Sequence, residues 1–337
     1  MGVSVRGTQR VLLAGLAGLY LAVQVGPAWQ AVYRSESGRD FATYYYAAQV
    51  ATAGGDPYDV DALGAAARAE GTRRSVHPYF YPPPFLLSMA WSLPLSLAAA
   101  YRTWFWLSQI WLALSVWVLR RWTGASWLSL GLIAATLTPL GDATKMGQAN
   151  HLVMLFLAVA LWRRSGGWLS AAAMSKMSPA LLLGLWGARL WWRPFLVAAA
   201  GAVIWSLLAL PLIDLPTQLR FYTEVLPGFS SGEYHGLKVP ITLPANHSIP
   251  DLYNQLWPGP NSRTLSPTAQ SAASATSATL LVALLAAGRR QRDRIGEACI
   301  AGAFVVLMVI TPVYTYEHHF AFSSPPPRSP LPGRPAA

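Results

Sequence analysis

Long apolar runs separated by short polar gaps dominate the chain. Several of these runs approach the roughly 20 residues that cross the hydrocarbon core of a bilayer. We expect membrane spans near residues 11–32, 103–119, 126–142, 149–162, 193–213, 270–288 and 295–313. Because a chain in lipid must satisfy its backbone hydrogen bonds internally, these spans are expected to be helices.

Two further stretches, 84–98 and 168–190, are apolar but irregular. Pro94 interrupts residues 84–98, so the sequence does not decide whether this stretch is a short span, an interfacial helix or a re-entrant segment. Arginines lie at both ends of the second, and Lys176-Met-Ser-Pro179 divides it. A hairpin of two half-helices, entering and leaving from the same side, fits this second stretch best.

Composition supports a membrane protein over a pair of soluble domains. Apolar residues make up 53% of the 337 positions and charged residues only 12%. The first apolar run has no small-residue cleavage site near its end, so we interpret it as a retained anchor. The one cysteine, Cys299, excludes an intrachain disulfide.

The formal charge of +11 comes largely from arginines in the short gaps between apolar runs. They are Arg6, Arg10, Arg120, Arg121, Arg163, Arg164, Arg189, Arg193, Arg289, Arg290, Arg292 and Arg294. This is the positive-inside pattern, which places the N-terminus and these gaps in the cytoplasm. A nucleic-acid-binding face is disfavoured, because lipid-length runs separate the basic clusters, and no nucleic-acid partner is expected.

Counting spans from a cytoplasmic N-terminus places two long loops, 33–83 and 214–269, on the outer face. The short segments 142–148 and 314–319 fall on the same side. We therefore predict an all-α, multi-pass bundle of about eight or nine spans or half-spans with two large outer loops. The Pro- and Arg-rich residues 321–337 are expected to be a disordered tail.

Asp40 is the strongest candidate for chemistry, because it follows the first span closely and lies beside Arg39. A carboxylate at the mouth of a membrane helix can act as a general base on a substrate at the lipid surface. Tyr44 and Tyr45, just downstream, are candidates to contact that substrate. The competing interpretation is an interfacial acid paired with Arg34 or Arg39.

Other polar residues on the outer side, or inside the apolar hairpin, are weaker candidates for binding. They are Gln148, Asn150, Lys176, Glu317, His318 and His319. The two amides can bind sugar hydroxyls or merely cap and pack helices. Lys176 is either a contact for a carrier lipid or a snorkelling side chain. The histidine pair suits phosphate or acceptor contact ahead of metal, or a place at the headgroup level, with Glu317 as a reserve acid or base.

Nucleotide-binding signals are weak in this sequence. Asp59-Val-Asp61 matches a metal-binding DxD triplet, yet such short matches are common and no strand precedes it. Neither a GxGxxG nor a GxxxxGK[ST] phosphate loop is present. This favours a lipid-linked donor over a nucleotide sugar, and we expect no cofactor and no convincing metal site.

Several motifs together resemble glycosyltransferase family 87, a group of polyprenol-phosphate-mannose-dependent mannosyltransferases in the GT-C superfamily. The resemblance covers roughly residues 10–320, and residues 1–320 would form one GT-C-like transmembrane domain. Its motifs, in order, are Asp40 with Tyr44-Tyr-Tyr-Ala-Ala48, Gly55-Asp-Pro-Tyr-Asp59, Tyr81-Pro-Pro-Pro84, Gly147-Gln-Ala-Asn150, Lys176-Met-Ser-Pro179 and Thr311-Pro-Val-Tyr-Thr-Tyr-Glu-His-His319.

The resemblance implies an enzyme of the plasma membrane whose active site faces outward. It would move a hexose, expected to be mannose, from a polyprenyl-phosphate carrier to a hydroxyl of a glycolipid or glycan, with inversion. Asp40 would be the general base. Arg39, His318 and His319 are candidates to stabilise the phosphate. Membrane lipids and the lipid-linked donor are its expected partners.

The chain departs from the family after the His-His segment, where Ser323-Ser-Pro-Pro-Pro-Arg follows in place of further membrane helices. This indicates a truncated or frameshifted relative, and an inactive scaffold is one alternative. A transporter or flippase of a lipid-linked sugar is another, since it also needs broken helices and an intramembrane charge. A related transferase that uses lipid-linked arabinose, or that modifies protein or polysaccharide, stays open too.

Overall fold

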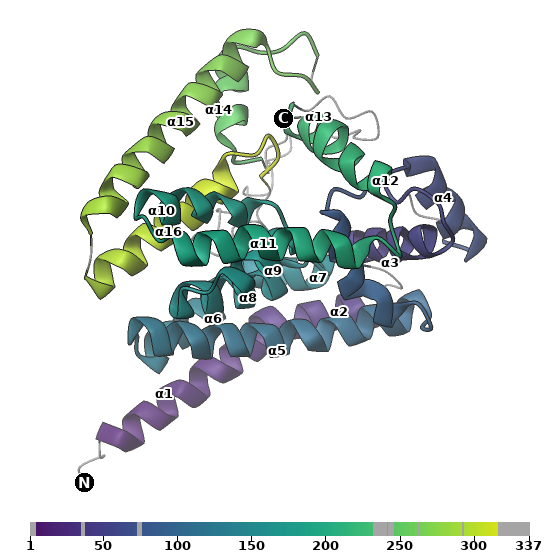
Figure 1. The fold of residues 1–337 in the computed structure, drawn as a ribbon. Helices are drawn as coiled ribbons and strands as arrows, with labels where there is room; N and C mark the ends of the chain where they lie inside the picture. Colours follow the sequence, from purple (N-terminus) through teal and green to yellow (C-terminus); the bar gives the residue numbers. More distant parts are fainter. Residues whose placement is uncertain are drawn as a thin grey trace, which may run out of the picture.

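The computed structural model describes residues 5–34, 38–72, 76–231, 241, 246–261, 263–291 and 293–315. Within these ranges every regular element is helical (Figure 1). The predicted all-α class is therefore confirmed. Glu317, His318, His319 and the predicted tail lie outside the described residues.

The first apolar run forms one long helix with a π-helical turn in its middle. It comprises α1 (Val5–Tyr20), the π turn Leu21–Val25 and α2 (Gly26–Arg34). Gln24, in this turn, is buried and donates to the Ala135 carbonyl over 3.2 Å while accepting from the Gly141 amide over 3.0 Å. A Cβ on Gly141 would lie 2.4 Å from Gln24 Oε1, so glycine permits this contact between two distant helices.

A layer of closely packed helices forms the middle of the molecule. α5 (Leu97–Thr123) packs along α8 (Asn150–Arg163), which in turn packs on α9 (Gly166–Ser175), and α9 packs on α11 (Trp192–Ala209). A Cβ on Gly166 would lie 2.2 Å from the Pro194 carbonyl oxygen. Small residues of this kind let membrane helices approach closely and gain packing contacts.

Three predicted apolar stretches are broken in the structure. Residues 126–142 form two helices, α6 (Trp127–Thr136) and α7 (Thr138–Met146), because Pro139 disfavours helical geometry just before it. The 3-10 helix Pro83–Ser92 meets α5 at 108°, which excludes one straight span through this region. Residues 168–190 form the predicted hairpin from α9, the 3-10 turn Ser178–Leu181 and α10 (Leu182–Ala188).

Fewer helices have full membrane length than the sequence predicts. Among the described residues, three helices are long and apolar enough to span a bilayer: Gly7–Arg34, Trp192–Ala209 and Pro267–Arg290. The bent pair formed by Pro83–Ser92 and Leu97–Thr123 is a fourth candidate if it is counted as one span. Other apolar helices, including α8, are shorter. A chain with several such helices is a membrane protein.

The arginine-rich gaps gather at one end of the bundle. Arg164 and Arg189 both contact Glu297, which lies in α16 (Arg294–Ile310), with N–O distances of 2.9 and 3.3 Å. The buried Arg189 also donates to the Gly288 carbonyl, near the end of α15 (Pro267–Arg290), over 2.7 Å. The ends of α8, α10 and α15 therefore meet the start of α16 on one side, as the charge pattern predicts.

The two long loops meet at the opposite end. The first contains α3 (Arg39–Thr52) and α4 (Val60–Ala69), and the second contains α12 (Leu215–Arg220), the π turn Phe221–Val225, α13 (Leu226–Ser231) and α14 (Ile249–Leu256). In Figure 1, α3, α4 and α12 lie together at the right, far from the N-terminus. Arg220 forms an ion pair with Asp56, and the Phe221 ring stacks on Tyr58 with a centroid distance of 5.3 Å.

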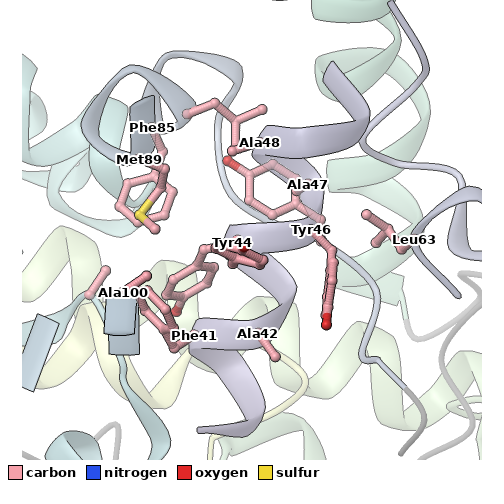
Figure 2. Close-up of a cluster of buried hydrophobic side chains, with 14 of the residues drawn as sticks. Phe41, Ala42, Tyr44, Tyr46, Ala47, Ala48, Leu63, Phe85, Met89 and Ala100 are labelled. Atoms are coloured by element: carbon pink, nitrogen blue, oxygen red, sulfur yellow. The ribbon is translucent and has the colours of Figure 1, made fainter. Parts of the chain in front are cut away.

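The helix α3 is enclosed by its neighbours and is not a solvated loop segment. All residues from Phe41 to Ala48 are buried. Figure 2 shows Phe41 and Tyr44 on the side of Phe85 and Met89, while Tyr46 and Leu63 lie together on the other side. Burial on both sides fixes the rotation of α3 and hence the direction of the side chains in its first turn.

Candidate functional site

Asp40 lies in the first turn of α3, where the helix dipole favours a negative charge. Gly38 precedes it in an extended conformation. A Cβ at Gly38 would lie 2.6 Å from the ring of Tyr101, so only glycine allows the chain to enter α3 this close to α5. The backbone therefore places a carboxylate at a buried junction between α3 and α5.

A chain of hydrogen bonds ends on the Asp40 carboxylate. The Gln148 Nε2 group donates to Asp40 Oδ2. Tyr81 donates its hydroxyl to Gln148 Oε1 over 3.0 Å, and Tyr44 donates to the Tyr81 hydroxyl over 2.6 Å. We call these four residues the Asp40 network; they come from three segments that are far apart in the sequence.

The position of Gln148 depends on the residue before it. Gly147 ends α7 with a φ of 69°, and a Cβ there would lie 2.5 Å from the Cβ of Phe41. The hydroxyl of Tyr101 donates to the Lys145 carbonyl and ties the same turn to α5. This turn therefore brings the Gln148 amide against α3.

Lys176 supplies a positive charge next to this network. It lies at the tip of the α9–α10 hairpin in an extended conformation, and its Nζ donates to Asn150 Oδ1 over 2.9 Å. The ammonium is close enough to Asp40 for the two opposite charges to attract. A carboxylate and a basic side chain thus share one site, with two amides beside them.

Tyr44 and Tyr81 keep their hydroxyl protons in this environment. Burial, followed by electrostatic repulsion that includes Asp40, raises the pKa of each phenol well above its ordinary value of 10.0. Both groups therefore remain hydrogen-bond donors at neutral pH and orient the Gln148 amide toward the carboxylate.

The site lies far from the arginine-rich end. Nearly the whole length of α5 separates Tyr101 from Arg121. Tyr101 lies against Gly147, and Arg121 is in the last turn of α5. At 1.5 Å per residue this separation is about 30 Å, close to the thickness of the hydrocarbon core. The Asp40 network therefore lies toward the end of α5 that is opposite Arg121.

Some residues predicted from the sequence are not part of this network in the described structure. The Tyr45 hydroxyl donates to the Leu95 carbonyl over 2.7 Å and to Glu70 over 3.3 Å. The backbone of Arg39 opens α3, but its side chain lies outside the described residues. Glu317, His318 and His319 lie outside them as well.

The DxD-like triplet has a local role in the structure. The Asp59 side chain caps α4 and accepts hydrogen bonds from the Asp61 and Ala62 amides over 2.9 and 3.3 Å. Such a cap satisfies amides that have no partner inside the helix. Among the described residues, no group of three or more His, Cys, Asp or Glu side chains is arranged to hold a metal.

Sequence reasoning did not select Tyr81 or His151 as site residues. Tyr81 had a usable signal, because it opens the Tyr-Pro-Pro-Pro motif and prolines fix the direction of the chain. His151 is fully buried directly after Asn150, and within the described part of the chain neither of its ring nitrogens has a hydrogen-bond partner. No sequence pattern around His151 indicates a functional role, since it is one polar residue at the start of an apolar run.

Comparison with known proteins assigns the family. A sequence model described as "Glycosyltransferase family 87" matches residues 79–312, well over half of the chain. The matched range includes Tyr81, Gln148, Asn150 and Lys176, and it begins after Asp40. No curated protein and no solved structure matches the chain. The chain belongs to glycosyltransferase family 87, in agreement with the resemblance of its motifs.

Proposed function

We propose that this membrane glycosyltransferase moves a hexose from a polyprenyl-phosphate carrier to an acceptor hydroxyl on the outer face of the plasma membrane. Asp40 acts as the general base. The donor sugar is mannose, as the resemblance of the motifs implies, and the acceptor is a glycolipid or glycan. The observation that carries the proposal is the hydrogen bond from Gln148 to Asp40 beside the pair formed by Lys176 and Asn150.

The chemistry of sugar transfer suits this arrangement. A sugar hydroxyl is a poor nucleophile until a base within hydrogen-bond reach takes its proton. The Gln148 amide holds the Asp40 carboxylate in a fixed orientation, so one of its oxygens can face the incoming hydroxyl. Gln148 and Asn150 are buried and Asp40 is only partly exposed, and such partial removal from water strengthens both interactions.

The leaving group requires charge stabilisation more than protonation. A polyprenyl phosphate already leaves as an anion, and a nearby cation lowers the energy of the charge that develops on its oxygens. Lys176 is the cation that the described site offers, held by the Asn150 side chain. Arg39, His318 and His319 remain further candidates for phosphate contact, and the mechanism as proposed uses no metal.

The number of carboxylates supports inversion. A single displacement needs one base, whereas retention through a covalent intermediate uses a carboxylate nucleophile and a second acid or base. The Asp40 network, as far as the structure describes it, contains one carboxylate. In a direct displacement the hydroxyl attacks opposite the phosphate, the new glycosidic bond forms as the sugar–phosphate bond breaks, and Asp40 takes the proton.

Sugar transfer in membranes tests the proposal. Membranes that contain the wild type, Asp40→Asn or Asp61→Asn would receive radiolabelled polyprenyl-phosphate-mannose, and labelled glycolipid would be measured. Asp61 is a matched control, since it lies in the first turn of another outer helix, α4. We expect a loss of about 100-fold or more in Asp40→Asn only. Full transfer by an inserted Asp40→Asn protein would refute the base assignment.

A further inference from the structure

A cavity of about 610 Å³ lies at the outer end of the bundle, away from the Asp40 network. Its walls are formed by α13, α14, α15 and the end of α16, with Pro227, Pro250 and Val313 opposite a face of α15. We call it the α15 cavity. Its volume is in the range of sites that hold small molecules.

The α15 cavity and the Asp40 network lie on two sides of one aromatic contact. Gly228 lines the cavity, and the next residue, Phe229, packs on Phe80 with a ring centroid distance of 4.3 Å. Phe80 directly precedes Tyr81, whose hydroxyl belongs to the Asp40 network. The wall of the cavity and the Asp40 network are therefore connected through the contact between Phe229 and Phe80.

One wall of the cavity carries unused hydrogen-bonding groups. Gln270, Ser274 and Ser277 face it from α15, at spacings that share one side of a helix. A hydroxyl in a helix commonly bonds back to the carbonyl four residues earlier, as Thr279 does to Ala275 over 2.8 Å. Within the described residues, none of the three cavity side chains makes a side-chain hydrogen bond.

The lining also indicates which kind of ligand fits. None of the lining residues is ionisable, whereas phosphate recognition relies on cations or clustered amides. The donor phosphate therefore belongs at Lys176 and not here. Hydroxyl and amide groups facing Pro and Val side chains suit a pyranose, which has apolar ring faces and a rim of hydroxyls.

The depth of the cavity agrees with a headgroup ligand. Ser274 and Arg290, in the last turn of α15, are separated by about 24 Å at 1.5 Å per residue. The cavity is therefore near the outer boundary of the hydrocarbon core, where sugars of glycolipids lie. We propose that the α15 cavity binds the sugar of the acceptor, a neutral glycan or glycolipid headgroup, an inference that rests on the proposed function.

Photolabelling measures binding without requiring transfer. The full chain in nanodiscs would be labelled with octyl hexopyranosides that carry a diazirine on the sugar, and the labelled peptides would be mapped. Ser274→Trp fills the cavity. Ser271→Trp is the matched control, since Ser271 is exposed on the same helix and does not line the cavity. Gln270→Leu removes one amide while nearly preserving volume, and Asp40→Asn removes the base.

We expect labelling of the wild type and Asp40→Asn within α15. It should fall about tenfold in Ser274→Trp and about three- to tenfold in Gln270→Leu, and stay unchanged in Ser271→Trp. Excess octyl hexoside should compete and octanol should not. The inference would be overturned if the two Trp variants were labelled equally. It would also be overturned if the wild type were labelled elsewhere, or if no hexoside labelled α15. A failure of the proposed base would instead appear as transfer that persists in Asp40→Asn.

Discussion

Tyr81 and Gln148, 67 residues apart in the sequence, are joined by a hydrogen bond of 3.0 Å that leaves the Gln148 amide directed at Asp40. The phenol accepts a further hydrogen bond from Tyr44. The orientation of the proposed base therefore depends on two tyrosines that act on it through the Gln148 amide. This dependence makes the site testable at residues beyond Asp40.

Removal of the Tyr81 hydroxyl should weaken catalysis without abolishing it. A neutral hydrogen bond contributes about 0.5–1.5 kcal/mol, so Tyr81→Phe should lower kcat about three- to tenfold while the KM of the donor stays nearly constant. Tyr79→Phe is the matched control, because Tyr79 is a buried neighbour whose hydroxyl makes only a 3.4 Å contact to the Pro82 carbonyl. Steady-state transfer kinetics would measure the difference, and equal losses in both variants would exclude an orienting role for Tyr81.

Loss of the Lys176 charge should affect the step that releases phosphate. Lys176→Met keeps the length of the side chain but removes the cation, and we expect transfer to fall about 100-fold. Lys176→Arg should retain part of the activity. Lys145→Met serves as a control, since Lys145 is half-exposed and paired with Asp142 over 3.0 Å. Wild-type rates in Lys176→Met would show that Lys176 has only a structural role.

A Cβ at Gly147 should displace Gln148 from Asp40. Gly147→Ala adds a methyl group that would lie 2.5 Å from the Cβ of Phe41, at a residue with positive φ. Gly124→Ala is the matched control, because Gly124 also has positive φ but has open space at that point. Both variants should lose about 1 kcal/mol from backbone strain, and only Gly147→Ala should also lose transfer.

Thermal unfolding and transfer, measured on both glycine variants, separate the two effects. Similar transfer rates in Gly147→Ala and Gly124→Ala would mean that the close contact with Phe41 does not position the amide.

The Tyr45 phenol should resist ionisation. Burial, with a smaller contribution from Glu70, raises the pKa of Tyr45 from 10.0 to about 12. Because the folded state holds this proton more tightly than the unfolded state, the associated stability is complete below pH 10 and is lost as the pH rises toward 12. Absorbance of tyrosinate at alkaline pH, compared with Tyr45→Phe, would measure it. A Tyr45 signal that titrates fully near pH 10 would contradict the assigned environment.

The sequence predicts that the protein lies in a membrane and is helical, because the free energy of moving a segment into lipid is nearly the sum of the contributions of its residues. The run before Arg34 appears in the structure as one long helix with nearly the predicted bounds. Two of the arginine gaps likewise come together, as the contacts of Arg164 and Arg189 with Glu297 show. The span count was less predictable, since Pro139 and the 108° turn before α5 break runs that hydropathy alone treats as continuous.

The sequence by itself determined that the chain is a helical membrane protein, and it predicts that Asp40, Gln148 and Asn150 lie on the face opposite the arginines. It also identified Lys176 as an unusual charge. Only the tertiary structure decided that Gln148 contacts Asp40, that the hairpin tip brings Lys176 to Asn150, and that Tyr45 points to Glu70 instead. These pairings join residues far apart in the chain, so they depend on how helices rotate and pack, which no local pattern encodes.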